Sequence, residues 1–325
     1  MEADTSDIRM FSGRSHPELA QEIADQIGIL LEETHFSRFS NDNLFIQLGA
    51  SVRGRKVLIV QSLIPPVSEH LLELFMMLDI ARSAAASEVH AIIPYFSYAR
   101  SDKKNAPRIS ITARLIADLL QTAGATQVMT MTLHSPQVHG FFGIPTDPLT
   151  ARGLFVHHLN QKKLDPRDSI VVAPDYGRAG SAGRVAAQLG LKSISAEKKR
   201  ISDTEVLVGE LIGKQVAGFR RALIYDDEIA TGGSVVNLCH RLVENGVEEL
   251  IIICTHGLFI NNALERIVAI PQVVEIVTTN TVPIPQEKRA PNMVVLSVAA
   301  VFGEAIRRNI THQSIGDLFA FWDDR

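Results

Sequence analysis

The chain has 325 residues, 46% of them hydrophobic and 21% charged, so it is long enough for two globular domains that each bury a core. Its formal net charge is −4 and its pI is near 6.3, whereas nucleic-acid-binding proteins carry a basic excess. We therefore expect no nucleic-acid partner and favour a charged small molecule as the ligand.

The N-terminal stretch MEADTSDIRM is acidic and lacks an apolar centre, so it is not predicted to be a signal peptide. No apolar run approaches the length of a membrane span, and we expect no membrane partner. The two cysteines, Cys239 and Cys254, form neither a metal pattern nor a disulfide framework. We interpret them as buried, reduced thiols in a cytoplasmic protein.

Apolar strands alternate with amphipathic helices along most of the chain, which indicates mostly parallel sheets with helices on both faces. The clearest strands of the first half are KVLIVQS, EVHAIIPYF and TQVMTMTL. A helix between the last two is expected to have Ser110 as its N-cap and to end at Gly124. The second half repeats the scheme with SIVVAP, ALIYDD, ELIIICTHG, VVEIVTT and MVVLSVAA.

The strand ends IIPYFSYAR and VVAPDYGRAG lie at comparable places in the two halves, which favours a tandem duplication. Turn residues at 145–150 precede a helix for which Thr150 is the expected N-cap. We predict an N-terminal domain over residues 1–149 and a C-terminal domain over residues 150–305. A helical tail, residues 306–325, is predicted to pack back on the N-terminal domain or on a neighbouring subunit.

Polar segments follow several of the strands, and in open α/β sheets ligands bind beyond the carboxyl ends of strands. The segment SYARSDKKNAPRIS places four basic residues on a connection of the kind that closes over phosphates. His134 and Asp175 each follow a strand, and a carboxylate at such a point can bind Mg²⁺. The run EKKR provides three further cations at 198–200. Taken alone, a basic loop or run of this kind is more often a solvated surface, and a lone histidine is more often a structural residue.

The stretch ALIYDDEIATGGSVV is predicted to form a strand over 222–225, a tight loop over 230–234 and a helix from Val235 onward. Backbone N–H groups around Gly232 and Gly233 can point at a phosphate, and the start of the helix adds partial positive charge. No lysine follows the glycines, so this is not a Walker A loop. The adjacent carboxylates Asp226 and Asp227 suit sugar hydroxyls or hydrated Mg²⁺, although a solvated turn with two surface acids fits the same pattern.

Together these segments resemble the ribose-phosphate pyrophosphokinase, or PRPP synthetase, family. The resemblance rests on the order and spacing of MFSGRSHPELAQEIA, RFSNDN, SVRG, IPYFSYARSDKK, LHSPQVHGFFGIP, DDEIATGGS and GEAIRRN, which span nearly the whole chain. It implies an α/β fold of two tandem phosphoribosyltransferase-type domains, Mg²⁺ as cofactor and a homo-oligomer, commonly a hexamer. The implied reaction transfers the β,γ-pyrophosphoryl group of ATP to the C1 hydroxyl of ribose 5-phosphate and releases AMP.

The resemblance also implies roles for individual residues. Lys198 and Arg200 match the catalytic lysine and the arginine beside it, and His134 and Asp175 match positions associated with Mg²⁺. ATP binding is implied for Phe39, Asn41, Asp42, Asn43, Arg100, Ser101 and His134. Ribose 5-phosphate binding is implied for Asp226, Asp227, Ala230, Thr231, Gly232, Gly233 and Ser234. Parts of a phosphate and ADP effector site between subunits are matched by Ser51, Arg53 and Ser314.

Several residues depart from the family pattern. Acids that are usual in the family are replaced at Asn43, Thr132, Gly143 and Ala230, and a normally glycine-rich turn contains Tyr176 and Arg178. These departures bear on metal affinity and nucleotide preference. They also favour an alternative function, a noncatalytic regulatory paralogue, which the retained Lys198 and His134 oppose. A third reading, a phosphoribosyltransferase that consumes PRPP, shares the DDEIATGGS type of loop but has no need of the first half.

Overall fold

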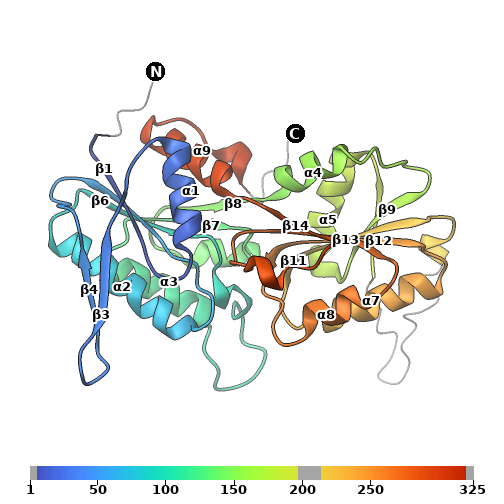
Figure 1. The fold of residues 1–325 in the computed structure, drawn as a ribbon, viewed down its shortest axis with the longest axis horizontal. Helices are drawn as coiled ribbons and strands as arrows, with labels where there is room; N and C mark the ends of the chain where they lie inside the picture. Colours follow the sequence, from blue (N-terminus) through green and yellow to red (C-terminus); the bar gives the residue numbers. More distant parts are fainter. Residues whose placement is uncertain (1–5, 197–213, 320–325) are drawn as a thin grey trace. The chain divides into compact units, whose positions relative to one another are not determined.

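The computed structural model describes residues 6–196 and 214–319, which fall into two compact units (Figure 1). Unit 1 contains the chain up to Thr150, together with Thr281–Pro283 and the segment from Ser297 onward. Unit 2 contains Ala151–Asn280 and Ile284–Leu296. The chain thus rejoins unit 1 at Ser297, whereas the sequence analysis expected the tail to begin at residue 306.

Unit 1 is built on a parallel sheet in the strand order β2–β1–β5–β6–β7–β8. The strands are β1 (Ile8–Ser12), β2 (Leu31–Glu32), β5 (Lys56–Val60), β6 (Glu88–Ile93), β7 (Gln127–Met131) and β8 (Thr146–Leu149). After their first residue, β5, β6 and β7 are buried throughout. Continuous apolar strands of this kind are expected where helices cover both faces of a parallel sheet.

Helices cover both faces of the unit 1 sheet (Figure 1). They are α1 (Pro17–Ile27), α2 (Val67–Ser83), α3 (Thr112–Ala123) and α9 (Ala299–Ile310), with 3₁₀ turns η1 (Ser97–Arg100), η2 (Pro136–Phe141) and η4 (Gly316–Leu318). Gly124 ends α3 as predicted, but the predicted N-cap Ser110 is wrong, because Ile111 takes that position without a side-chain hydrogen bond. The N–H of Ala113 is instead bonded to the carbonyl of Ser101 at 3.2 Å.

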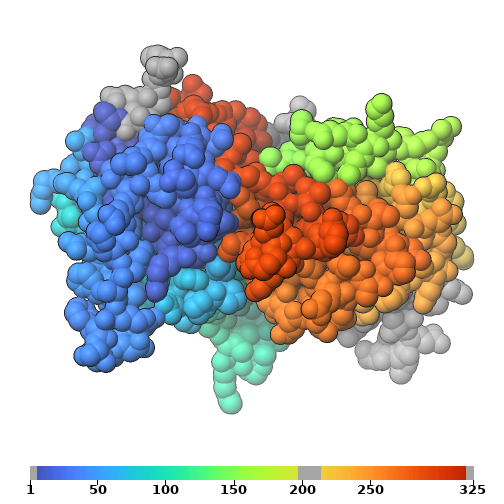
Figure 2. Space-filling view, in the orientation of Figure 1, coloured from blue at the N-terminus to red at the C-terminus, as the bar shows by residue number. Residues whose placement is uncertain are grey.

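A two-stranded antiparallel hairpin, β3 (Thr34–Arg38) and β4 (Leu44–Leu48), also belongs to unit 1. Its tip protrudes at the lower left of the space-filling view (Figure 2). The connecting loop 39–43 is closed by a hydrogen bond from the N–H of Phe39 to the carbonyl of Asn43, 2.9 Å long. Asp42 has φ 68°, a left-handed conformation that aspartate tolerates better than most residues.

Unit 2 repeats the architecture with a parallel sheet in the order β10–β9–β11–β12–β13–β14. Its strands are β9 (Ser169–Ala173), β10 (Lys192–Ser195), β11 (Arg221–Ile229), β12 (Glu249–Gly257), β13 (Val273–Thr279) and β14 (Met293–Leu296). Its helical segments are α4 (Arg152–Asn160), α5 (Tyr176–Leu189), α7 (Gly233–Glu244), α8 (Ala263–Val268) and the 3₁₀ turn η3 (Gln286–Lys288).

Three boundaries in unit 2 differ from the prediction. Strand β11 continues to Ile229, because its pairing with β12 extends that far. Helix α7 begins at Gly233, two residues earlier than expected. Thr150 is not the N-cap of α4; Ala151 holds that position, and the N–H of Thr150 donates to the carbonyl of Leu318 at 2.9 Å.

The two sheets share one strand order, in which the third main strand returns to the opposite side of the first. The predicted α/β class, with two mostly parallel sheets flanked by helices, is therefore confirmed. Both cysteines are buried and unpaired as predicted, and burial raises the pKa of each thiol to about 12. Among the described residues, no helix is long and apolar enough to cross a membrane.

Candidate active site

The strand order of unit 2 marks one point at which a ligand can bind. From β9 the chain runs to β10 on one side and then to β11 on the other, so the crevice beyond the carboxyl ends of β9 and β11 is a topological switch point. Asp175 lies two residues after the end of β9, while Asp226 and Asp227 lie near the carboxyl end of β11. The topology thus places three predicted carboxylates, from two segments of unit 2, at the same end of the sheet.

Asp175 has a structural role in the described fold. It is the N-cap of α5, and its Oδ1 accepts a hydrogen bond from the N–H of Arg178 at 3.1 Å. An aspartate in this position satisfies one of the unpaired N–H groups of the first helical turn. The carboxylate is therefore held at the mouth of the switch point, with oxygen lone pairs beyond the one used for capping.

Asp226 and Asp227 are successive residues of β11, and the Asp226 carboxylate accepts a hydrogen bond from the N–H of Asp227 at 2.8 Å. Asp227 is 5% exposed. Burial, and then the neighbouring charge of Asp227, raises the pKa of Asp226 well above its ordinary value. On Asp227, Oδ1 lies 3.4 Å from Nε of Arg178. The two carboxylates therefore occupy different electrostatic surroundings although they are adjacent.

The predicted phosphate loop connects β11 to α7. Gly232 is the N-cap of α7 and adopts φ 72°, a conformation that glycine reaches without a Cβ penalty. A Cβ at Gly232 would lie 3.3 Å from the Cβ of Ala263, whereas a Cβ at Gly233 would have no heavy atom within 4 Å. The described protein therefore leaves open space at Gly233, beside the N–H groups of the first turn of α7, where an anion is electrostatically favoured.

The predicted nucleotide residues of unit 1 fall into two groups. The first is the hairpin loop, where Phe39 is 57% exposed and packs edge-on against Phe45 with ring centroids 5.7 Å apart. Asp42 and Asn43 line a hollow of about 550 Å³ between the hairpin and α2, together with Leu72 and other residues. Phe39 and Asn41 are not among the residues that line this hollow.

Two loop residues already have partners inside the hairpin. The side-chain carbonyl of Asn41 accepts the N–H of Asn43 at 3.3 Å. Arg38 donates to the carboxylate of Asp42 at 2.9 Å and also to Glu69 of α2 at 2.6 Å. The loop is therefore a hydrogen-bonded turn that Arg38 ties to α2.

The second group follows the strands β6 and β7. Arg100 is exposed at the end of η1, and Ser101 comes directly after it. His134 is half-buried and lies just beyond β7, two residues after Thr132, which has φ 44°. A positive φ is uncommon for a β-branched residue, and strain of this kind concentrates at functional sites.

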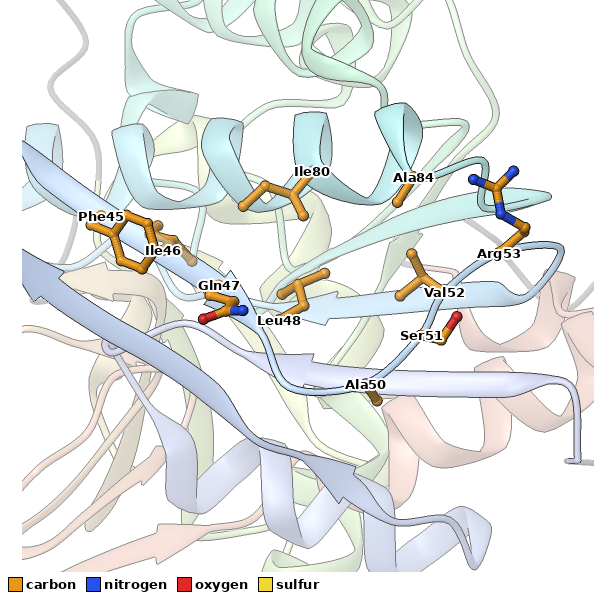
Figure 3. Close-up of a pocket in the computed structure, with 10 residues that line it drawn as sticks. All are labelled: Phe45, Ile46, Gln47, Leu48, Ala50, Ser51, Val52, Arg53, Ile80 and Ala84. Atoms are coloured by element: carbon orange, nitrogen blue, oxygen red, sulfur yellow. The ribbon is translucent and has the colours of Figure 1, made fainter.

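The candidate effector residues are only partly brought together. Ser51 and Arg53 line a hollow of about 370 Å³, on the segment after β4 and opposite Ile80 and Ala84 of the α2 end (Figure 3). Ser314 is not among the residues that line this hollow. Its hydroxyl accepts the N–H of Gly316 at 3.4 Å. The predicted catalytic residues Lys198 and Arg200 lie outside the residues that the structure describes.

Comparisons with known proteins agree with this architecture. A family profile described as the N-terminal domain of ribose phosphate pyrophosphokinase matches residues 8–124, and one described as a phosphoribosyl synthetase-associated domain matches residues 206–320. A relative from Streptomyces coelicolor is 47% identical over 313 residues, which are 96% of this chain and 98% of the relative. The ribose-phosphate pyrophosphokinase of Deinococcus radiodurans is 43% identical over 326 residues, covering 98% of this chain and 100% of that protein.

The chain belongs to the ribose-phosphate pyrophosphokinase family. A solved structure agrees: the crystal structure of phosphoribosylpyrophosphate synthetase from Mycobacterium smegmatis superposes with a TM-score of 0.86 at 34% identity, covering 94% of this chain and 100% of that chain. The predicted family and its two-domain α/β fold are thus confirmed. Within this ribose-phosphate pyrophosphokinase family member, the sequence analysis gave no site role to Arg178, although that residue reaches Asp227.

Proposed function

We propose that the protein is an active ribose-phosphate pyrophosphokinase, which transfers the β,γ-pyrophosphoryl group of ATP to the C1 hydroxyl of ribose 5-phosphate and releases AMP. One observation carries this proposal. The acids Asp175, Asp226 and Asp227 and the open space at Gly233 share the switch point of unit 2, in a chain that aligns over nearly its whole length with relatives of that name.

The acceptor is assigned to unit 2. The 5-phosphate would lie in the loop that contains Ala230, Thr231, Gly232, Gly233 and Ser234, where backbone N–H groups and the start of α7 favour negative charge. The ribose hydroxyls would donate to Asp226 and Asp227. A carboxylate that accepts from two neighbouring hydroxyls orients the sugar, which is the main need of a reaction catalysed by alignment.

The donor is assigned to residues of unit 1. Asn43 would accept from the adenine amino group through its side-chain carbonyl, in place of the usual acid, and Phe39 would contact the base with its exposed ring. Asn41 and Asp42 would shape that loop. Arg100, Ser101 and His134 would contact the polyphosphate, because they follow the carboxyl ends of strands β6 and β7.

Mg²⁺ suits the donor atoms that the chain provides. No group of three or more metal-ligating side chains is found among the described residues, so a cage made wholly of protein atoms is not indicated there. Mg²⁺ is commonly bound through one or two carboxylates, with substrate phosphates and water as its other ligands, and Asp175 offers such an oxygen. His134 is a poorer donor for this ion. When bound, Mg²⁺ would offset charge on the polyphosphate of ATP.

The proposed catalytic residues, Lys198 and Arg200, would stabilise negative charge in the transition state. During transfer, negative charge develops on the nonbridging and leaving oxygens, and fixed cations near these atoms lower the barrier. If both residues meet the substrates only when both are bound, hydrolysis of ATP by water is also limited.

Assembly and regulation are part of the same proposal. We infer a cytoplasmic homo-oligomer, a hexamer by resemblance to the family, with ATP and ribose 5-phosphate as its small-molecule partners. Ser51 and Arg53, at the hollow after β4, together with Ser314, would contribute to a phosphate and ADP effector site. The absence of an acid at Ala230 is the observation that favours the second candidate, a noncatalytic regulatory paralogue.

The decisive experiment incubates the purified protein with ATP, ribose 5-phosphate and Mg²⁺ and measures AMP and PRPP over time. Equal amounts of the two products, with no AMP when ribose 5-phosphate is omitted, would support the proposal. Binding of both substrates without AMP formation would favour the regulatory paralogue. AMP formation without PRPP would contradict both.

A further inference from the structure

Arg178 is a buried arginine at the switch point of unit 2. It belongs to the first turn of α5, three residues after the N-cap Asp175. Its side chain is 10% exposed, and its Nε lies 3.4 Å from Oδ1 of Asp227, whose side chain is 6% exposed. Burying a guanidinium is costly unless it is paired, and Asp227 provides the opposite charge here.

The pair joins the two segments that form the crevice. Arg178 comes from the helix that follows β9, and Asp227 from the neighbouring strand β11. It therefore links the elements on either side of the switch point. Asp226 and Asp227 are adjacent acids that repel each other when both are ionised. The positive charge of Arg178 beside Asp227 offsets part of that repulsion.

We propose that Arg178 is a positioning residue for ribose 5-phosphate, because it holds the Asp227 carboxylate in the orientation that accepts hydrogen bonds from the ribose hydroxyls. The proposal rests on the proposed function, in that it takes ribose 5-phosphate as the acceptor. A carboxylate can accept several hydrogen bonds, so an ion-paired Asp227 can still accept from sugar hydroxyls. The ligand class is a pentose 5-phosphate with hydroxyls at C2 and C3.

The test measures binding of ribose 5-phosphate by calorimetry in four proteins: wild type, Arg178→Ala, Asp227→Asn and the double variant. We expect Arg178→Ala to raise the dissociation constant at least about tenfold, as for the loss of one partner of a buried charge pair. In the Asp227→Asn background the same change should have an effect of less than about twofold, because Arg178 acts through Asp227. Equal effects in both backgrounds would overturn the proposal.

A second measurement separates positioning from a general loss of structure. Wild type should bind ribose 5-phosphate more tightly than 2-deoxyribose 5-phosphate, and Arg178→Ala should reduce this preference, while the KM for ATP stays within about twofold. Arg178→Lys should restore part of the preference, because lysine keeps the positive charge. The restoration should be incomplete, because lysine lacks the planar guanidinium group. If the preference is unchanged in Arg178→Ala, the residue has only a structural role.

The matched control is Arg167→Ala. Arg167 also pairs with an aspartate of unit 2, Asp165, but its side chain is 90% exposed. We expect this variant to bind both sugars as wild type does. Failure of the proposed function can be told apart from failure of this inference. If the wild type binds ribose 5-phosphate but forms no AMP, the proposed reaction is refuted, yet the binding constants of the four proteins still test the role of Arg178.

Discussion

Arg14 and Glu73 form an ion pair in which the carboxylate is fully buried: Nε of Arg14 donates to Oε1 of Glu73 at 2.6 Å, and the Glu73 side chain has no exposed surface. Gln61 donates to the other carboxylate oxygen at 2.8 Å. Arg14 follows β1 and Gln61 follows β5. The switch point of unit 1 lies between these two strands. Side chains of unit 1 thus bond to one another at the point that corresponds to the candidate site of unit 2.

The first prediction concerns this pair. Arg14→Ala leaves a buried carboxylate with Gln61 and the N–H of residue 14 as donors. Because the Arg14 side chain is 39% exposed, we expect the free energy of unfolding to fall by about 2 kcal/mol, less than for a fully buried pair. Urea denaturation measures the change. The exposed pair of Arg167 and Asp165 provides the control, and Arg167→Ala should cost no more than about 1 kcal/mol. Equal costs for the two variants would contradict the prediction.

The second prediction concerns Gly303 in α9. Alanine usually stabilises a helix relative to glycine by about 1 kcal/mol, but a Cβ at Gly303 would lie 2.7 Å from the Cβ of Gln26 in α1. We therefore expect Gly303→Ala to lower the melting temperature. Gly153→Ala in α4, where a Cβ meets no heavy atom within 4 Å, should raise it or leave it unchanged. Stabilisation by both variants would show that α1 and α9 separate easily.

The third prediction concerns the pH dependence of stability. His90 is buried, and its Nε2 lies 2.9 Å from Glu88, which Lys56 also contacts at 2.9 Å. Burial lowers the pKa of His90 below its ordinary value of 6.5, although Glu88 acts in the opposite direction. His90 therefore binds a proton more readily in the unfolded chain than in the folded one. Its contribution to stability is fully present above about pH 6.5 and is lost as the pH falls towards the pKa of His90 in the folded protein.

The measurement is the unfolding free energy of wild type and His90→Gln between pH 7 and 5. In the variant, the dependence of the unfolding free energy on pH should become less steep, by up to about 1.4 kcal/mol per pH unit, which corresponds to one bound proton. Burial opposes the shift in Glu88, but hydrogen bonds from Lys56 and His90 lower its pKa overall, so that residue acts in a separate window below 4.5. His35→Gln is the control, because His35 also pairs with a glutamate two residues before it, Glu33, but its side chain is exposed. An unchanged slope in His90→Gln would refute the assignment.

The fourth prediction tests the phosphate loop. A Cβ at Gly233 would have no heavy atom within 4 Å, so we expect Gly233→Val to keep the fold and to occupy space assigned to the 5-phosphate. We expect the KM for ribose 5-phosphate to rise at least about tenfold, with the KM for ATP little changed. Should ATP binding weaken while ribose 5-phosphate binding stays normal, the donor and acceptor assignments would have to be exchanged.

The fifth prediction concerns Lys198. Lys198→Ala should lower kcat by about 100-fold to 1,000-fold, the scale for removing a positioned group that acts on transition-state charge. Binding of ribose 5-phosphate, measured by calorimetry, should be nearly unchanged, because the lysine is not assigned to the 5-phosphate. Near wild-type turnover would remove Lys198 from the mechanism.

Local patterns were enough to predict the alternating strands and helices. The run KVLIVQS contains β5, Gly124 ends α3, and both cysteines are buried. Each of these features follows from apolar periodicity or from the conformational freedom of glycine, which are properties of a few neighbouring residues. The identity of the family followed from longer motifs, because their order along the chain is itself a property of the sequence.

The tertiary structure alone determined how far β11 extends and what its acids contact. Asp226 and Asp227 were expected after the strand, but β11 contains both, because its ladder with β12 pairs Asp226 with Cys254 and continues to Ile229. The predicted cap Ser110 was wrong, and the N–H of Ala113 donates to the distant carbonyl of Ser101; Thr150 was wrong because α4 begins one residue later, with Ala151 as its N-cap. Arg178 was a departure from a glycine-rich turn in the sequence and became the partner of Asp227 only when β9 and β11 paired side by side. The physical reason is that the partner of a buried charge is set by strands far apart in sequence, which parallel pairing brings to one edge of a sheet.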